Sequence, residues 1–175
     1  MNAKGIELGI RAISCAKWQW REGMLIGATK HLLGHGQTSI PKSYGSGRVI
    51  GVNYYEERCA YGTPIVENDE FAEEVDGPIP DLFDSATKGC LLDLVRQAWL
   101  NPSIYLAPFY TNTDDGEVVW WAIASNTVWE TQPRIEYLTR SQGIVEHYLA
   151  AETEIEALVV ALENAPLAVD SLNKL

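Results

Sequence analysis

The sequence has few cysteines, few basic residues and no long apolar run, and each shortage excludes a class of protein. The three cysteines, Cys15, Cys59 and Cys90, are odd in number and widely spaced, which does not fit the framework of a disulfide-rich secreted domain. No segment approaches the ~18 apolar residues of a membrane-spanning helix, and residues 1–9 lack the apolar core of a signal peptide. We therefore expect reduced thiols and a cytoplasmic location.

Basic residues are outnumbered along the chain. Among 175 residues there are 13 Lys and Arg against 24 Asp and Glu, a formal net charge of −11. This charge argues against a protein whose whole surface binds nucleic acid or an anionic membrane. The hydrophobic content of 46% excludes wholesale disorder, and ordinary numbers of Gly (14) and Pro (8) exclude collagen-like and low-complexity classes.

The charge is divided unevenly. Residues 1–66 hold eight bases and four acids, a net of +4, whereas residues 67–175 hold five bases and twenty acids, a net of −15. A solvated surface that keeps the protein soluble would explain the acids, and so would a surface that binds a basic partner or occupies a nucleic-acid-binding groove as a decoy. The densest acidic run comprises Glu67, Asp69, Glu70, Glu73, Glu74 and Asp76.

Hydrophobic periodicity predicts an α+β fold in a single domain over residues 1–175. We expect a mainly antiparallel sheet of about three to five strands, packed by about three helices. The helices are expected at 3–15, 85–100 and about 141–163, and Asp84 is the expected N-cap of the second. Strands are expected at 24–28, 48–55, 103–110 and 117–125, the last two joined as a hairpin. The acidic, Gly- and Pro-punctuated segment 61–81 is predicted to be mobile.

Two interpretations of the C-terminal third differ in where a helix begins. Apolar residues at alternating spacings of four and three, from Ile144 to Leu162, favour one continuous helix. The sequence Thr153-Glu154-Ile155-Glu156 instead fits a capping box, which would start a new helix at Thr153. We favour one helix over 144–162, which would also offer a seam for a homodimer.

No residue pattern indicates catalysis, a metal or a cofactor. His31 and His35 are four residues apart, but Gly34 and Gly36 interrupt a helix there, and no zinc-ligand motif occurs. We therefore predict a protein that is not an enzyme, with a small enzyme of unrecognised site as an alternative. A second alternative is a nucleic-acid-binding role for the basic N-terminal third, through a basic and aromatic group of Lys30, His31, Lys42, Tyr44, Arg48, Tyr54 and Tyr55.

Adjacent tryptophans mark the strand predicted at 117–125. Trp120 and Trp121 must lie on opposite faces of that strand, and both faces are apolar. Either a second layer covers both faces, or one face awaits a partner. Trp and Tyr dominate the energetics of protein interfaces, so the pair is a candidate anchor for a protein partner.

One stretch carries a family resemblance. Residues 81–99 read DLFDSATKGCLLDLVRQAW. This segment resembles the motif Asp-x-Ala-Thr-x-Gly-Cys-Leu-Leu-x-Leu-Val-Arg-x-Ala-Trp of uncharacterised small bacteriophage and prophage proteins. Ser85 stands where that family usually has proline, and Gln97 where it has glutamate. Residues 18–24 and 156–163 resemble the same group. The resemblance implies a phage or mobile-element origin and carries over no catalytic residue.

Together these features predict an accessory protein that acts inside the host cell. By analogy with small, acidic phage proteins, including inhibitors of CRISPR systems, we expect it to bind and inhibit a host defence protein, such as a nucleic-acid-binding complex. The expected binding surface combines the acidic run with the two adjacent tryptophans. The full set of expected contact residues is Glu67, Asp69, Glu70, Glu73, Glu74, Asp76, Trp120 and Trp121.

Overall fold

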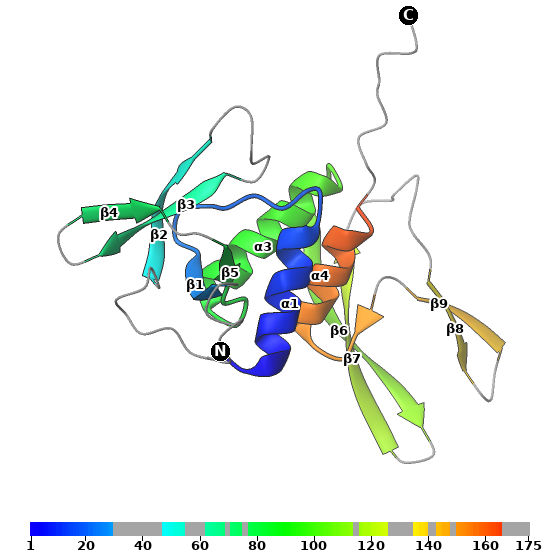
Figure 1. Cartoon of the computed structure of the whole chain (residues 1–175). Coiled ribbons are helices and arrows are strands. Elements are labelled where there is room, and N and C mark those ends of the chain that lie inside the picture. Colours follow the sequence, from blue (N-terminus) through cyan, green and yellow to red (C-terminus); the bar gives the residue numbers. More distant parts are fainter. Residues whose placement is uncertain are drawn as a thin grey trace, which may run out of the picture. The chain divides into compact units, whose positions relative to one another are not determined.

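The computed structural model describes residues 1–29, 47–54, 62–68, 71–74, 77–113, 116–125, 135–139, 143–147 and 150–165. Their contacts form two compact units, residues 1–94 and 95–175, and each is described by itself (Figure 1). The expectation of a single domain stays a prediction. The α+β class is confirmed, because helices accompany sheets whose strand pairs are all antiparallel.

A five-stranded antiparallel sheet forms the frame of the first unit. Its strands lie in the order β4-β3-β2-β1-β5, so β4 and β5 are the edges. Helix α1 spans Ala3–Ser14, close to the predicted 3–15, and Asn2 caps it by accepting a hydrogen bond from the Gly5 N–H at 2.8 Å. The strands are β1 (Leu25–Thr29), β2 (Gly47–Asn53), β3 (Thr63–Asn68), β4 (Phe71–Glu74) and β5 (Pro78–Pro80).

The core of this unit lies where α1 meets β5. Leu8 and Ala12 are buried on one side of α1, and Ile79 is buried in β5. The approach is so close that a Cβ on Gly9 would lie 2.6 Å from the Ile79 Cγ2 and 2.9 Å from the Pro80 carbonyl oxygen. Glycine is therefore required at this point of α1. Farther along the chain, Trp18 and Trp20 pack edge to face with ring centroids 5.5 Å apart, and both are buried.

Helix α3 (Ser85–Ala98) confirms the helix predicted at 85–100. Leu91, Leu94 and Val95 are fully or almost fully buried, as the helical spacing indicates. At its end Leu100 adopts a left-handed conformation with φ of 50°, and the Asn101 N–H bonds the Arg96 carbonyl at 2.9 Å. This arrangement closes the last turn of the helix and satisfies carbonyls that would otherwise have no partner.

The second unit contains a long hairpin and a short helix. Strands β6 (Ile104–Thr113) and β7 (Gly116–Ser125) pair along their whole length, as the predicted hairpin requires, with two residues between them. Strand β10 (Ala150–Ala151) pairs with β7 at Trp121 and Ala122, and α4 (Glu154–Glu163) contacts both β7 and β10. Strands β8 (Ile135–Thr139) and β9 (Gly143–His147) form a separate two-stranded sheet.

The prediction of one continuous helix over about 141–163 is wrong. Residues 143–147 and 150–151 are strands, and the helix begins only at Glu154. The capping-box interpretation holds, because the Thr153 hydroxyl accepts a hydrogen bond from the Glu156 N–H at 3.2 Å. Pairing with β7 holds Ala150 and Ala151 extended just before the N-cap. The continuous seam on which we based a homodimer over 144–162 is therefore absent.

The acidic segment 61–81 contains more regular structure than the sequence indicated. We placed no strand there, whereas β3, β4 and β5 all fall within it. Its Gly and Pro residues separate or begin short strands: Gly77 has φ of 56°, and Pro78 and Pro80 bound the edge strand β5. The mobility of the segment stays a prediction.

Two glycine-to-alanine changes test the close packing of α1. Gly9→Ala forces a Cβ against the backbone of Pro80, so we expect destabilisation of about 1–3 kcal/mol, as for an overpacked core. Gly89→Ala in α3 meets no atom within 4 Å and should stabilise the protein by about 0.5–1 kcal/mol through helix propensity. Urea unfolding of both variants measures the difference. Equal effects in the two helices would contradict the packing of α1 on β5.

Candidate protein-binding site

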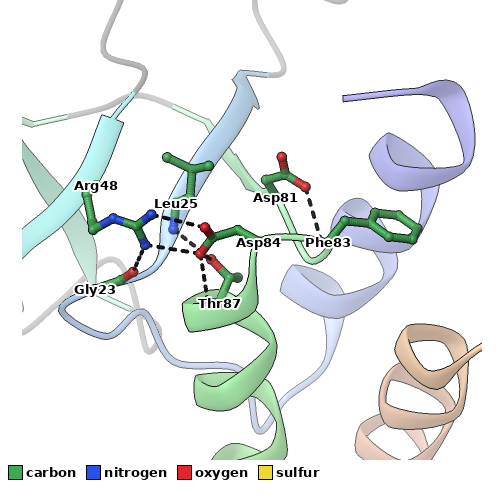
Figure 2. A network of polar contacts seen from close by, with 7 residues as sticks. All are labelled: Gly23, Leu25, Arg48, Asp81, Phe83, Asp84 and Thr87. Atoms are coloured by element: carbon green, nitrogen blue, oxygen red, sulfur yellow. Dashed lines mark hydrogen bonds and ion pairs between the residues drawn. The ribbon is translucent and has the colours of Figure 1, made fainter.

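A network of polar contacts connects α3 to two strands of the first unit (Figure 2). Asp84 precedes α3, and its Oδ2 accepts hydrogen bonds from the Thr87 N–H and the Thr87 hydroxyl, each at 3.0 Å. This confirms Asp84 as the N-cap. From β2, the Arg48 guanidinium donates to both Asp84 carboxylate oxygens, each at 3.0 Å, and to the Gly23 carbonyl.

Thr87 links the same network to β1. Its side chain is fully buried, and its hydroxyl oxygen accepts a hydrogen bond from the Leu25 N–H at 2.7 Å while donating to Asp84. Because the Thr87 hydroxyl both donates and accepts, its own hydrogen-bonding groups are satisfied inside the protein. Helix α3 and strands β1 and β2 are therefore joined by one continuous set of hydrogen bonds.

The network changes the acidity of Asp84. Its hydrogen bonds from Arg48 hold the pKa of this carboxyl well below its usual range, with further lowering by Thr87. Partial burial opposes this effect but is weaker. The Asp84 side chain is only 16% exposed, whereas the Arg48 side chain is 48% exposed. The carboxylate is therefore ionised at any pH at which the protein is handled.

Arg48 belonged to the basic and aromatic group of the nucleic-acid alternative. Its guanidinium is held by a carboxylate and a backbone carbonyl, so most of its donors are already used. Tyr54, of the same group, is exposed. The remaining members, Lys30, His31, Lys42, Tyr44 and Tyr55, lie outside the described residues.

The acidic run follows the hairpin of β3 and β4. Glu67 is exposed in β3 and pairs across the ladder with Ala72, while Glu73 and Glu74 of β4 pair with Val66 and Ile65. Strand β4 is an edge of the five-stranded sheet, so Glu73 and Glu74 lie on an edge strand, whereas Glu67 lies in the neighbouring strand β3. Asp69, Glu70 and Asp76 fall outside the described residues.

The two predicted tryptophans lie in β7, in the other unit. Trp120 pairs with Phe109 and Trp121 with Pro108, which places the tryptophans on opposite faces of the hairpin. Both are partly buried. The structure thus divides the predicted contact residues between two units, the acids in one and the tryptophans in the other.

Sequence reasoning missed the most exposed apolar residues of this hairpin. Tyr110 is 61% exposed and Val119, directly opposite it, is 41% exposed, while Val118 on the other face is 36% exposed and Tyr105, nearer the base, is 40% exposed. Near the base of the hairpin, Ile104 and Ile123 are buried. The signal was present in the sequence, because residues 118–121 are apolar on both faces, whereas the buried residues of the second strand, Ala122 and Ile123, lie at the base of the hairpin.

The described residues offer little to catalysis. They contain no group of three His, Cys, Asp or Glu side chains that could hold a metal ion. Cys15 is buried, and partial burial raises the pKa of the Cys90 thiol, which disfavours its nucleophilic thiolate form. His31, His35 and Cys59 lie outside the described residues.

Comparison with known proteins adds no relative. No protein-family model, curated protein or solved structure matches this chain. The resemblance to small phage proteins therefore stays a prediction. Within the described part of the chain, no helix is long and apolar enough to span a bilayer.

Replacing the Thr87 hydroxyl tests the link between α3 and β1. Thr87→Val keeps the shape of the side chain but leaves the partly buried Leu25 N–H without its acceptor, so we expect a loss of about 1–3 kcal/mol in unfolding free energy. Thr87→Ser keeps the hydroxyl and serves as the matched control, with a smaller loss from the missing methyl group. Urea unfolding followed by circular dichroism distinguishes them. A Val variant as stable as the Ser variant would contradict the network.

The low pKa of Asp84 predicts a pH-dependent contribution to stability. Because the folded-state pKa lies below the unfolded value of about 3.9, the stabilisation is fully present above about pH 5 and is lost as the pH falls toward the folded-state pKa. Asp84→Asn retains an N-cap side chain but removes the charge. Between pH 6 and pH 3 we expect wild type to lose on the order of 1 kcal/mol more than this variant. Parallel pH profiles of unfolding free energy would refute the assignment.

Proposed function

We propose that this protein is a phage or mobile-element accessory protein that binds a host defence protein in the cytoplasm and inhibits it, as anti-CRISPR proteins do. The observation that carries the proposal is the β6–β7 hairpin, whose outer half exposes apolar side chains on both faces. Exposed apolar groups gathered on one element are typical of protein-binding surfaces. Tyr110 and the partly buried tryptophans are of the residue types that dominate interface energetics.

Charge supports a basic partner. The chain has a net charge of −11, and the β3–β4 hairpin places Glu73 and Glu74 on an edge strand and Glu67 on the strand beside it. Complementary charge accelerates association and selects among partners more than it adds affinity. Nucleic-acid-binding defence complexes carry basic grooves, so an acidic inhibitor would be drawn to them. Apolar contacts of the β6–β7 hairpin would then supply the slow dissociation that inhibition requires.

Phage plating tests this function directly. Expression of the protein in a host with an active defence system should raise the plating efficiency of a targeted phage, with no effect in the same host lacking that system. Tyr110→Ser combined with Val119→Thr should reduce the rescue, because both changes remove exposed apolar surface without disturbing the buried base of the hairpin. Gly89→Ala, at an open helix position, is the matched control and should rescue fully.

Failure to rescue phages against every defence system tested, from a protein that is folded and well expressed, would reject inhibition of host defence.

A further inference from the structure

The two edges of the β6–β7 hairpin differ in how they are covered. In an antiparallel ladder, residues alternate between pairs that hydrogen-bond to each other and pairs whose N–H and C=O groups point outward. The register Thr113–Gly116 leaves two residues between the strands, and the pair that flanks such a turn is a hydrogen-bonded one. Counting back along the strands, the outward pairs are then Asn112–Glu117, Tyr110–Val119, Pro108–Trp121, Leu106–Ile123 and Ile104–Ser125.

Three further observations agree with this assignment. Pro108 has no N–H and is tolerated within a sheet only where that group would point outward. Ile104 bonds outside the ladder, since its N–H donates to the Asn101 carbonyl at 3.4 Å and its carbonyl accepts from the Arg96 Nε at 2.9 Å. Trp121 is where β10 pairs with β7 on the side away from β6.

The outer edge of β6 is poorly suited to accept another strand. At its base, the outward groups of Ile104 are already bonded to Asn101 and Arg96. In its middle, Pro108 offers no donor. Proline on an edge strand is one of the devices by which proteins prevent edge-to-edge pairing.

The edge of β7 differs in its outer half. Strand β10 covers only Trp121 and Ala122, and after Ala151 the chain turns into α4 through the N-cap Thr153. Among the described strands, none pairs with Gly116–Val119 on this side. The outward N–H and C=O groups of Glu117 and Val119 therefore continue the β10 ladder, and no described strand lies opposite them. Figure 1 shows this end of the hairpin extending away from α4.

We infer that the outer edge of β7, Glu117–Val119, binds an extended segment of the partner protein as an added strand beside the end of β10. This inference rests on the proposed function and names the mode of binding. Strand addition draws its affinity from main-chain hydrogen bonds and its specificity from alternate side chains. The added strand would lie on the same side of β7 as β10.

The chemistry of the hairpin specifies the segment that fits. Val118 and Val119 present exposed apolar side chains on opposite faces, so a strand beside them is apolar on both faces. Residues 103–125 contain three acids and no base, all of them between 114 and 117. The segment therefore carries Lys or Arg at the end nearest the turn of the hairpin. A second copy of this chain fits less well, because each copy has a net charge of −11.

Peptide selection tests whether such a segment binds. The full-length protein is immobilised and exposed to a library of random linear peptides. We expect enriched peptides to be rich in β-branched residues, with Lys or Arg at one end. A synthetic copy of the most enriched peptide, labelled with fluorescein, then reports affinity by anisotropy. Methylation of its alternate backbone amides should weaken binding about tenfold or more, because it removes the donors of the added strand. Enrichment of helical patterns, or indifference to methylation, would overturn the inference.

Variants of the protein itself test the same edge of β7. Val119→Pro removes the outward N–H without removing a donor to β6, and should weaken the same peptide about tenfold. Val119→Thr keeps the N–H and the β-branched shape but loses exposed apolar surface, so it should weaken the peptide much less than Val119→Pro does. If Val119→Pro misfolds, as judged by circular dichroism, the methylated peptide still decides the question on the unaltered protein.

Other outcomes separate this inference from the proposed function. If the protein rescues phages but Val119→Pro rescues equally, the inference fails and the function stands. If the peptide binds at β7 but no defence system is inhibited, the function fails and the edge remains a binding site. A wild-type dimer in sedimentation that Val119→Pro dissociates would show that a second copy occupies the edge, which overturns the assignment of a partner strand.

Discussion

The first unit depends most on the hydrogen bonds and the ion pair that the carboxylate of Asp84 makes. This carboxylate caps α3, pairs with Arg48 of β2 and receives the hydroxyl of Thr87, which in turn accepts the Leu25 N–H of β1. Each of these contacts alone is modest, since exposed ion pairs and single caps contribute about 1 kcal/mol. Because one carboxylate makes all of them, losing it would free a helix end, a guanidinium and a buried hydroxyl together. Polar networks of this kind hold more than the sum of their pairs.

The same network shows why charge counted along a sequence differs from charge available to a partner. Arg48 is one of eight bases that make residues 1–66 positive, yet its guanidinium already bonds Asp84 and Gly23. The acid that neutralises it lies beyond residue 66, so the division of charge along the chain partly cancels in space. The acids of β3 and β4 have no such base opposite them in their ladder: Glu67, Glu73 and Glu74 face Ala72, Val66 and Ile65. The acids of this ladder therefore lie opposite apolar residues and not opposite bases.

What the sequence predicted well were elements defined by local rules. Helix α3 has its cap, its apolar spacing and its Asn-Pro end within twenty or so residues, and the β6–β7 hairpin has a short polar turn between two apolar runs. The prediction was wrong where distant pairing decided the outcome. Residues 144–151 carry a helical spacing, but the pairing of Ala150 and Ala151 with β7 is a contact that no local pattern contains. Strand β5 was hidden for the same reason, since it pairs with β1 far away in sequence, whereas β3 and β4 form a local hairpin that its acidic sequence obscured.

The candidate site was predictable in part. Adjacent Trp120 and Trp121 indicated a strand with two apolar faces, and the structure places them on such a hairpin. Which edge of that hairpin lacks a neighbouring strand among the described residues could not be predicted. It depends on where β10 stops and on the contacts of Ile104 with Arg96 and Asn101. Whether a strand edge has a neighbour depends on how the strands pair, and no single residue type determines it.

The sheet edges of this protein are protected by different means, and the contrast favours use of one of them. Strand β4 carries Glu73 and Glu74, and β6 carries Pro108 and is bonded at its base by Arg96. The outer half of β7 has Glu117 but also two exposed valines and no proline. An apolar edge without such protection is a risk of aggregation, and among the described strands the outer half of β7 lacks the devices that β4 and β6 carry. The proposed strand addition would cover this edge through main-chain groups, which persist when the side chains of a partner change.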